Sequence, residues 1–251
     1  MSVEQATALV LKCVDFSETS LVVTLFTREF GKIQGLAKGG KRLKGPFDSA
    51  LDLLALCRIV FLRKSSEALD LLTEAKLQRR FRPAGRDLSS LYAGYYVAEL
   101  LNDLTDQYDP HPELFDLAVA TLAALSAGEP VLLYTARFEL CMLHILGHLP
   151  SLTTCVECGS EVSLSGRVAF GQAHGGVLCG QCREGKKEVA SVSAGVVRIM
   201  QELARLESHS WRRIDIDARS RGELRGVLNR YLTHLLGRKP RMHRYLGLLT
   251  T

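Results

Sequence analysis

The sequence predicts an α+β protein of several domains: a small N-terminal β-barrel, followed by an α-helical domain that contains an inserted four-cysteine module. Short apolar runs with period-two alternation fill residues 1–80. Longer stretches with helical periodicity fill much of residues 81–251. Two C-x2-C pairs lie between residues 151 and 188. We therefore expect domains at 1–80 and 81–251, with the cysteine module at 151–188.

Five short strands are expected in the first part of the chain. The runs are rich in Val, Ile, Leu, Thr and Phe, and segments with turn-forming residues separate them. A barrel of five strands is most commonly an OB fold, which binds ligands on its second and third strands and the adjoining loops. An SH3-like barrel fits the same pattern. The expected strands are residues 7–12, 20–26, 32–37, 51–62 and 68–72.

Helical periodicity begins after residue 86. Asp87 is a plausible N-cap for the first helix, while Gly128 and Gly147 follow the second and third. Two later amphipathic stretches are expected to pack against these three helices, because three short helices enclose little core. The expected helices are residues 87–108, 113–127, 130–146, 194–206 and 221–236.

Composition excludes several classes of protein. Apolar residues make up 47% and charged residues 24% of the 251 residues, which excludes wholesale disorder. No apolar run approaches the roughly 18 residues that cross a bilayer. The start, MSVEQATALVLKC, lacks the basic region of a secretory signal, so we expect a soluble cytoplasmic protein without membrane contact.

Charge is segregated along the chain. The net charge of +5 divides into +4 for residues 1–80, −6 for 81–150, 0 for 151–188 and +7 for 189–251. Two basic ends around an acidic middle indicate contact with a polyanion. The alternative is that the basic ends pair with the acidic middle inside one fold.

The two cysteine pairs predict a metal site. Cys155 and Cys158 are separated by 20 residues from Cys179 and Cys182. Two such knuckles complete a tetrahedron of thiolates, a soft ligand set that selects one Zn²⁺ ion. Because four thiolates close the coordination shell, the predicted site is structural, not catalytic. Two disulfides or a redox C-x2-C motif are the alternatives.

A basic loop follows the third expected strand. Residues 28–44 contain six basic residues and one acidic residue. Gly39 and Gly40 allow close backbone approach to a ligand. Phe26, Phe30 and Phe47 are either base-stacking faces or, more commonly, barrel core. A solvated charged loop is the alternative interpretation. The DNA-binding candidates are Arg28, Lys32, Lys38, Lys41, Arg42 and Lys44, with a weaker second cluster at Arg238, Lys239, Arg241 and Arg244.

Several motifs together resemble the RecO family of bacterial recombination mediators in the RecF repair pathway. The N-terminal motifs are Leu11, residues 18–20, 26–32 and 37–42, and Pro46-Phe47. The C-terminal motifs are residues 138–140, 146–147, Pro150, the segment 155–159, and the Gly-Gly and C-x2-C of 175–182. Their order and spacing span nearly the whole chain.

The resemblance implies a non-enzymatic DNA-binding protein with an OB domain, a helical domain and a zinc module. It implies binding of single- and double-stranded DNA, annealing of complementary strands and help in loading recombinase during DNA repair. The implied partners are RecR and the acidic C-terminal tail of single-strand-binding protein. Arg137, beside the motif at 138–140, is a candidate contact for that tail, although an arginine among acids is more often part of an ion pair.

Two other functions are compatible with parts of the sequence. A zinc-ribbon adaptor would use the basic loop to meet an acidic protein partner. A zinc-dependent nucleic-acid hydrolase would need an open metal position, and the sequence has no motif such as H-E-x2-H to supply one.

Overall fold

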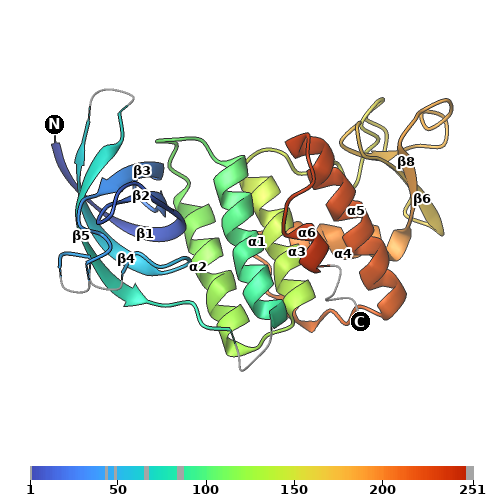
Figure 1. Cartoon of the computed structure of the whole chain (residues 1–251). Coiled ribbons are helices and arrows are strands. Elements are labelled where there is room, and N and C mark those ends of the chain that lie inside the picture. The colour runs from blue at the N-terminus through green and yellow to red at the C-terminus, as the bar shows by residue number, and fades with distance from the viewer. Residues whose placement is uncertain (1, 43–44, 48–49, 65–67, 84–87, 247–251) are drawn as a thin grey trace. The chain divides into compact units, whose positions relative to one another are not determined.

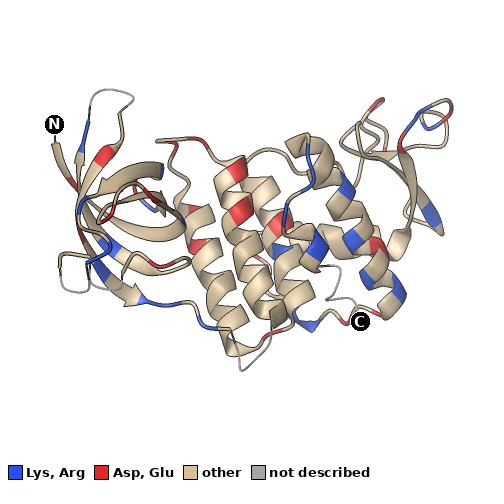
Figure 2. Ribbon diagram, viewed as in Figure 1, with Lys and Arg blue, Asp and Glu red and all other residues tan. Residues whose placement is uncertain are grey.

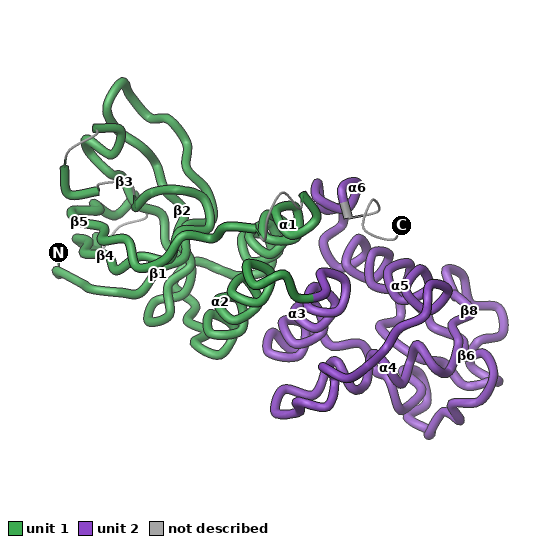
Figure 3. Tube along the Cα trace, turned by 90° about the horizontal axis from the view of Figure 1, so that it is seen from below, with its two compact units in different colours: residues 1–129 green, residues 130–251 purple. Residues whose placement is uncertain are grey.

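The structure is a computed structural model that describes residues 2–42, 45–47, 50–64, 68–83 and 88–246. The chain divides into two compact units, residues 1–129 and 130–251, coloured separately in Figure 3. Within the described residues, no helix combines the length and apolarity that crossing a membrane requires.

The first unit contains the expected β-barrel. Its five strands close in the order β1-β2-β3-β5-β4, and only β3 and β5 pair in parallel. This Greek-key barrel confirms the predicted OB-like fold class. The strands are β1 (Ser2–Asp15), β2 (Leu21–Thr27), β3 (Gly31–Ala37), β4 (Leu56–Arg63) and β5 (Asp70–Arg79), shown at the blue end of Figure 1.

Strand β1 is long because it pairs with two neighbouring strands. Its first part pairs with β4 and its second part with β2. The register shifts between Val10 and Lys12, and such a bulge bends a strand so that it can turn the corner of a barrel. The fourth expected strand, 51–62, begins only at Leu56, because Leu54 adopts a left-handed turn conformation with φ 63°.

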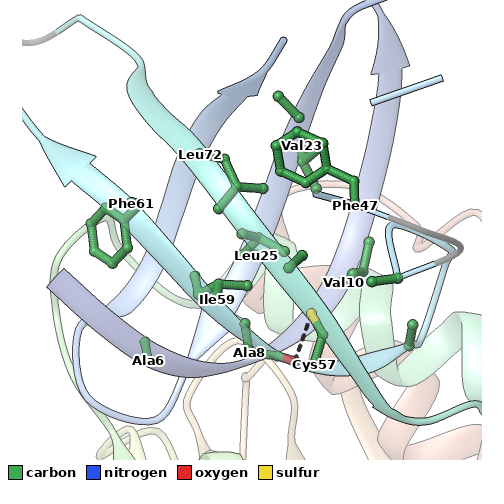
Figure 4. Close-up of a cluster of buried hydrophobic side chains, with 14 of the residues drawn as sticks. Ala6, Ala8, Val10, Val23, Leu25, Phe47, Cys57, Ile59, Phe61 and Leu72 are labelled. Atoms are coloured by element: carbon green, nitrogen blue, oxygen red, sulfur yellow. Dashed lines mark hydrogen bonds between the residues drawn. The ribbon is translucent and has the colours of Figure 1, made fainter. Parts of the chain in front are cut away.

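Alternating side chains of the strands fill the barrel. Figure 4 shows Leu25, Ile59 and Leu72, from β2, β4 and β5, pointing toward one another. All three are at most 2% exposed, and burying each such side chain contributes roughly 1.5–3 kcal/mol. Phe26 points the other way and packs against Phe115, with ring centroids 6.1 Å apart. The barrel core is therefore formed by one face of each strand.

Two helices, α1 (Leu88–Leu104) and α2 (Pro112–Ala127), complete the first unit. Their connection contacts the end of the β2–β3 turn and the start of β3, where Tyr108 N–H donates to the Lys32 carbonyl over 2.9 Å. Gly31 has φ +68°, and a β-carbon there would lie 2.0 Å from the Asp109 carbonyl oxygen. Only glycine therefore allows this turn to meet the connection.

The second unit is built from helices around a small sheet. The sheet order is β7-β6-β8, and helices α3, α4 and α5 pack on one another. The three short strands of three to five residues were not expected from the sequence. The elements are α3 (Val131–Ile145), β6 (Arg167–Gly171), β7 (Gly176–Leu178), β8 (Val189–Ser193), α4 (Ala194–Ala204), η1 (Ser210–Arg213), α5 (Ala218–Leu236) and α6 (His243–Leu246).

All five expected helices are present, each within a few residues of its predicted bounds, while Asp87, the predicted N-cap of the first, lies outside the described residues. Helices α1 and α2 share a compact unit with the barrel, whereas α3 belongs to the second unit. A domain boundary between residues 80 and 81 therefore stays a prediction.

Candidate metal centre and nucleic-acid interface

Four cysteine sulfurs converge in the second unit. The Sγ atoms of Cys155, Cys158, Cys179 and Cys182 all lie within 4.8 Å of one another. Each pair lies on a tight turn, in which Gly159 N–H donates to the Cys155 carbonyl over 2.8 Å and Arg183 N–H to the Cys179 carbonyl over 3.2 Å. The four cysteines predicted from the sequence spacing therefore form one cluster in the structure. It is positioned to hold a metal ion.

Backbone pairing brings the two knuckles together. Ser151 N–H donates to the Gly175 carbonyl, and Val177 N–H donates to the Ser151 carbonyl, both over 2.9 Å. A β-carbon at Gly176 would lie 2.4 Å from the Ser151 carbonyl oxygen. The Gly175-Gly176 pair is therefore explained by close backbone contact between the segments that carry the ligands.

The electrostatics of the cluster favour a bound cation. Backbone N–H groups lower the pKa of Cys155 to about 6, while hydrogen bonding to the neighbouring sulfurs raises the pKa of Cys182 to about 12. Four thiolates this close repel one another, so they ionise together only around a positive charge. Among the described residues this is the one group of three or more potential metal ligands.

The basic loop of the barrel forms a tight turn after β3. Gly40 N–H donates to the Ala37 carbonyl over 3.2 Å, and Arg42 N–H donates to the Gly39 carbonyl over 3.0 Å. Gly39 has φ +77°, which favours glycine. The turn leaves Lys38 and its two following cations, Lys41 and Arg42, exposed at the end of β3. We call these three residues the barrel turn.

The barrel turn also contacts the β1–β2 loop. Lys41 N–H donates to the Thr19 carbonyl over 3.1 Å, and its ammonium lies 2.9 Å from the Asp15 carboxylate. An exposed ion pair of this kind contributes at most about 1 kcal/mol, so a phosphate can replace the carboxylate.

The other predicted cations of this region have different surroundings. Arg28 makes a bidentate pair with Asp116, at 2.9 and 3.0 Å. The half-buried Lys32 ammonium donates to carbonyls of Asn102, at 2.6 Å, and Thr105 near the C-terminal end of α1. Burial lowers the pKa of Lys32. These two side chains stabilise the first unit, and Lys44 lies outside the described residues.

The three phenylalanines considered for base stacking belong to the protein interior. Phe26 and Phe47 are buried, and the Phe30 ring packs edge-on against Phe61 with centroids 5.5 Å apart. The exposed aromatic ring of this region is Phe16, whose residue is 62% exposed in the β1–β2 loop. Phe16 is not among the predicted site residues, although a large apolar residue inside a polar turn is a usable signal.

Arg137 is buried in the second unit, which does not support its predicted contact with a partner. Its guanidinium donates to the carbonyls of Arg205 and Leu206, at 2.6 and 2.9 Å, just beyond the end of α4. The ring of Trp211 lies beside the same group. Burial lowers the pKa of Arg137. The side chain therefore caps a helix.

The second basic cluster follows the end of α5. Arg238, Lys239, Arg241 and Arg244 are exposed. Figure 2 shows several Lys and Arg positions in blue along α5. Lys239, Arg241 and Arg244 line a cavity of about 990 Å³, whereas Arg238 is outside that lining. This cavity is the larger of the two principal ones in the described part of the chain.

Comparisons with known proteins agree with this architecture. The family described as recombination protein O, N terminal, matches residues 1–81, and recombination protein O, C terminal, matches residues 85–244. DNA repair protein RecO of Rhodopirellula baltica is 40% identical over 95% of this chain and 97% of its own length. Those of Anaeromyxobacter dehalogenans and Moorella thermoacetica are 34% and 32% identical, over 96% and 97% of this chain and 94% and 90% of their own lengths. The chain belongs to the RecO family of DNA repair proteins.

Proposed function

We propose that the protein is a non-enzymatic recombination mediator that binds DNA through its phosphates, anneals complementary strands and helps load recombinase onto coated single strands. The observation that carries the proposal is the exposed barrel turn beside the ligand-binding strands of an OB-like barrel. Family membership supports DNA binding and a role in repair.

Annealing follows from simple electrostatics. Two complementary strands repel one another through their phosphates, and cations that bind the backbone reduce this repulsion while the bases stay available for pairing. Such a process needs neither a nucleophile nor an open metal position. Exposed lysine and arginine side chains on a tight turn provide the required charge.

Several further properties belong to the same proposal. RecR and the acidic tail of single-strand-binding protein are the proposed partners, and the cytoplasmic nucleoid is the proposed location. The four cysteines are proposed to bind one structural Zn²⁺, because an all-sulfur set with four ligands suits zinc and leaves no position for a reacting water. The ion would supply folding energy, and the barrel residues would contact DNA.

Charge reversal of the barrel turn tests the DNA interface. Lys38→Glu, Lys41→Glu and Arg42→Glu together are expected to weaken binding to oligonucleotides of every sequence alike, because phosphates carry no sequence information. Losing three phosphate contacts makes the negative slope of log affinity against log salt concentration shallower by roughly 2 for a single strand. Fluorescence anisotropy across a salt series measures both quantities.

A matched triple variant provides the control. Arg58→Glu, Lys76→Glu and Arg79→Glu make the same charge change at exposed positions of β4 and β5. Equal weakening by both triple variants would show that only net charge matters. Absence of salt-sensitive binding by the wild-type protein would favour the adaptor function instead.

Phe16 is proposed to stack on bases of a single strand. A base–aromatic stack contributes about 1–3 kcal/mol, so Phe16→Ala is expected to weaken single-strand binding about 5- to 160-fold. Duplex binding should change little, because paired bases are already stacked. Phe16→Trp is expected to retain binding and to lose indole fluorescence when a strand is added.

The buried Trp211 gives a constant background in that measurement. Val3→Trp places an indole at a similarly exposed position on β1, away from the β1–β2 loop, as the control. Quenching of both engineered indoles to the same extent, or an equal loss of duplex binding in Phe16→Ala, would contradict the stacking role.

A further inference from the structure

The cavity of the second unit is lined by cations from two segments. Arg230 lies on α5, and Lys239, Arg241 and Arg244 lie in the segment that follows this helix. All four residues are exposed, and Glu188 is the one carboxylate in the described lining. We call this the C-terminal cavity.

The fold places these cations on one concave surface. Gly226, Arg230 and His234 are spaced four residues apart and therefore share a face of α5. A β-carbon at Gly226 would lie 3.4 Å from an Arg230 Nη atom, so the guanidinium extends back along the helix. Gly237, with φ +67°, ends α5 and lets the chain turn. Residues 239–244 then line the same cavity.

An adjoining side of α5 is anchored to the core of the unit, and Asn229, which lines the cavity, takes part in this anchor. Arg225 donates to both carboxylate oxygens of Glu139 at 2.8 Å and to the Asn229 side chain at 2.7 Å. Burial lowers the pKa of His243 to about 4, so this ring adds no charge at neutral pH. Arg230 is thus presented by a helix that other side chains hold in place.

Three of the four cavity cations have no carboxylate partner in the part of the chain that the structure describes. Among the described residues, no carboxylate lies within ion-pair distance of Arg230, Lys239 or Arg244. Like charges around a concave surface focus the potential and concentrate anions. A ligand with several negative groups is therefore the kind that this surface attracts.

The charged groups of the lining suit phosphates. Arginine and lysine are joined by the polar side chains of Gln172 and Thr233, and Pro240 is the one apolar side chain in the described lining. Arginine matches phosphate oxygens with paired donors, and an extended chain of phosphates presents such oxygens to several cations in turn.

We infer that the C-terminal cavity binds the phosphate backbone of a second nucleic-acid strand, separately from the strand bound at the barrel turn. The inference rests on the proposed function and extends it. Each compact unit would hold one strand, and two complementary strands on one chain would meet at a raised effective concentration. With two sites, one chain would bring both strands of a complementary pair together. With a single site, the second strand would have to arrive from solution.

The test is the number of strands that one chain binds. The metal-loaded full-length protein is titrated with a labelled oligothymidylate about eight nucleotides long, within the roughly 4–16 nucleotides that one OB fold covers. Native mass spectrometry counts bound strands at low ionic strength. Wild type is expected to bind two strands, and the cavity variant Arg230→Gln with Lys239→Gln is expected to bind one.

Two further double variants separate this inference from the proposed function. The barrel variant, Lys38→Gln with Arg42→Gln, should also bind one strand, and combining both pairs should abolish binding. Arg213→Gln with Arg219→Gln removes two exposed cations elsewhere in the second unit and should leave two strands bound. Because all these residues are exposed, unchanged circular dichroism and unfolding temperature are expected.

Specific outcomes overturn one claim or the other. One strand on wild type, lost only in the barrel variant, would overturn the second site and keep the proposed function. If wild type binds one strand and only the cavity variant loses it, the barrel interface is wrong and the cavity is the binding site. If a glutamate-rich peptide binds the cavity while the cavity variant still takes two strands, the cavity is a peptide site and the inference is wrong.

Discussion

Replacing Cys158 by serine is expected to release the bound metal ion, unfold the two cysteine knuckles and lower the solubility of the protein. The four sulfurs lie within 4.8 Å of one another, and three remaining thiolates form an incomplete shell around zinc. Binding of structural zinc contributes roughly 10–16 kcal/mol at neutral pH, which is most of the folding energy of a segment this short. Elemental analysis of the purified variant measures the metal directly.

Amide hydrogen exchange is expected to locate the damage. Protection should be lost in the knuckles around residues 155–158 and 179–182. Strand β6 should keep more protection, because Phe170 packs on Tyr231 of α5 and Arg167 pairs with Glu223 at 2.7 Å. Chelation of the wild-type protein should reproduce this pattern.

Cys13→Ser provides the matched control. The Cys13 thiol donates to the Leu51 carbonyl, a hydrogen bond that a serine hydroxyl can replace, and the residue is outside the cluster. This variant should retain one metal ion per chain. Full metal content in Cys158→Ser would show that the ligands are misassigned. If chelation stopped annealing while the barrel stayed folded, the cysteine module would have a direct role in DNA binding.

Local patterns made the barrel and the cysteine site predictable. In β3, every second residue is buried, so the period-two alternation of apolar residues identifies the side chains that face the barrel core. The C-x2-C spacing likewise determines a turn within a few residues. The short strands β6, β7 and β8 lack such a signal, because three to five residues with glycines give too little periodicity.

Roles that depend on distant partners were not predictable. Lys32 meets the end of α1 at Asn102 and Thr105, and Arg137 meets carbonyls more than 60 residues away. Nothing in the local sequence distinguishes such a cation from one that contacts DNA. The sequence predicts which residues are basic, whereas only the fold shows which of them are already engaged within the protein.

The buried ion pair between Glu139 and Arg225 predicts the second large effect. Glu139 is fully buried and Arg225 is 7% exposed. Arg225→Met removes the guanidinium from both carboxylate oxygens and leaves a buried negative charge that has lost its cation. Removing one partner of such a pair costs about 3–5 kcal/mol. The free energy of unfolding of the second unit should fall by this amount.

Trp211 makes the measurement specific to the second unit. It is the one tryptophan in the chain, and its ring packs edge-on against Tyr134 with centroids 4.9 Å apart. Urea unfolding followed by indole fluorescence therefore reports this unit without a contribution from the barrel. Amide hydrogen-exchange protection of the barrel strands should change little in the variant.

The double variant Glu139→Leu with Arg225→Met separates the two causes of instability. Replacing a whole buried ion pair by apolar side chains is often neutral or stabilising, because the desolvation cost of both charges is removed. The double variant is therefore expected to recover most of the stability lost by Arg225→Met. A double variant as unstable as the single one would show instead that packing and the hydrogen bond to Asn229, not the stranded charge, make Arg225 important. Because α5 carries both this anchor and Arg230, the single variant should also weaken strand binding at the C-terminal cavity, and the double variant should restore it.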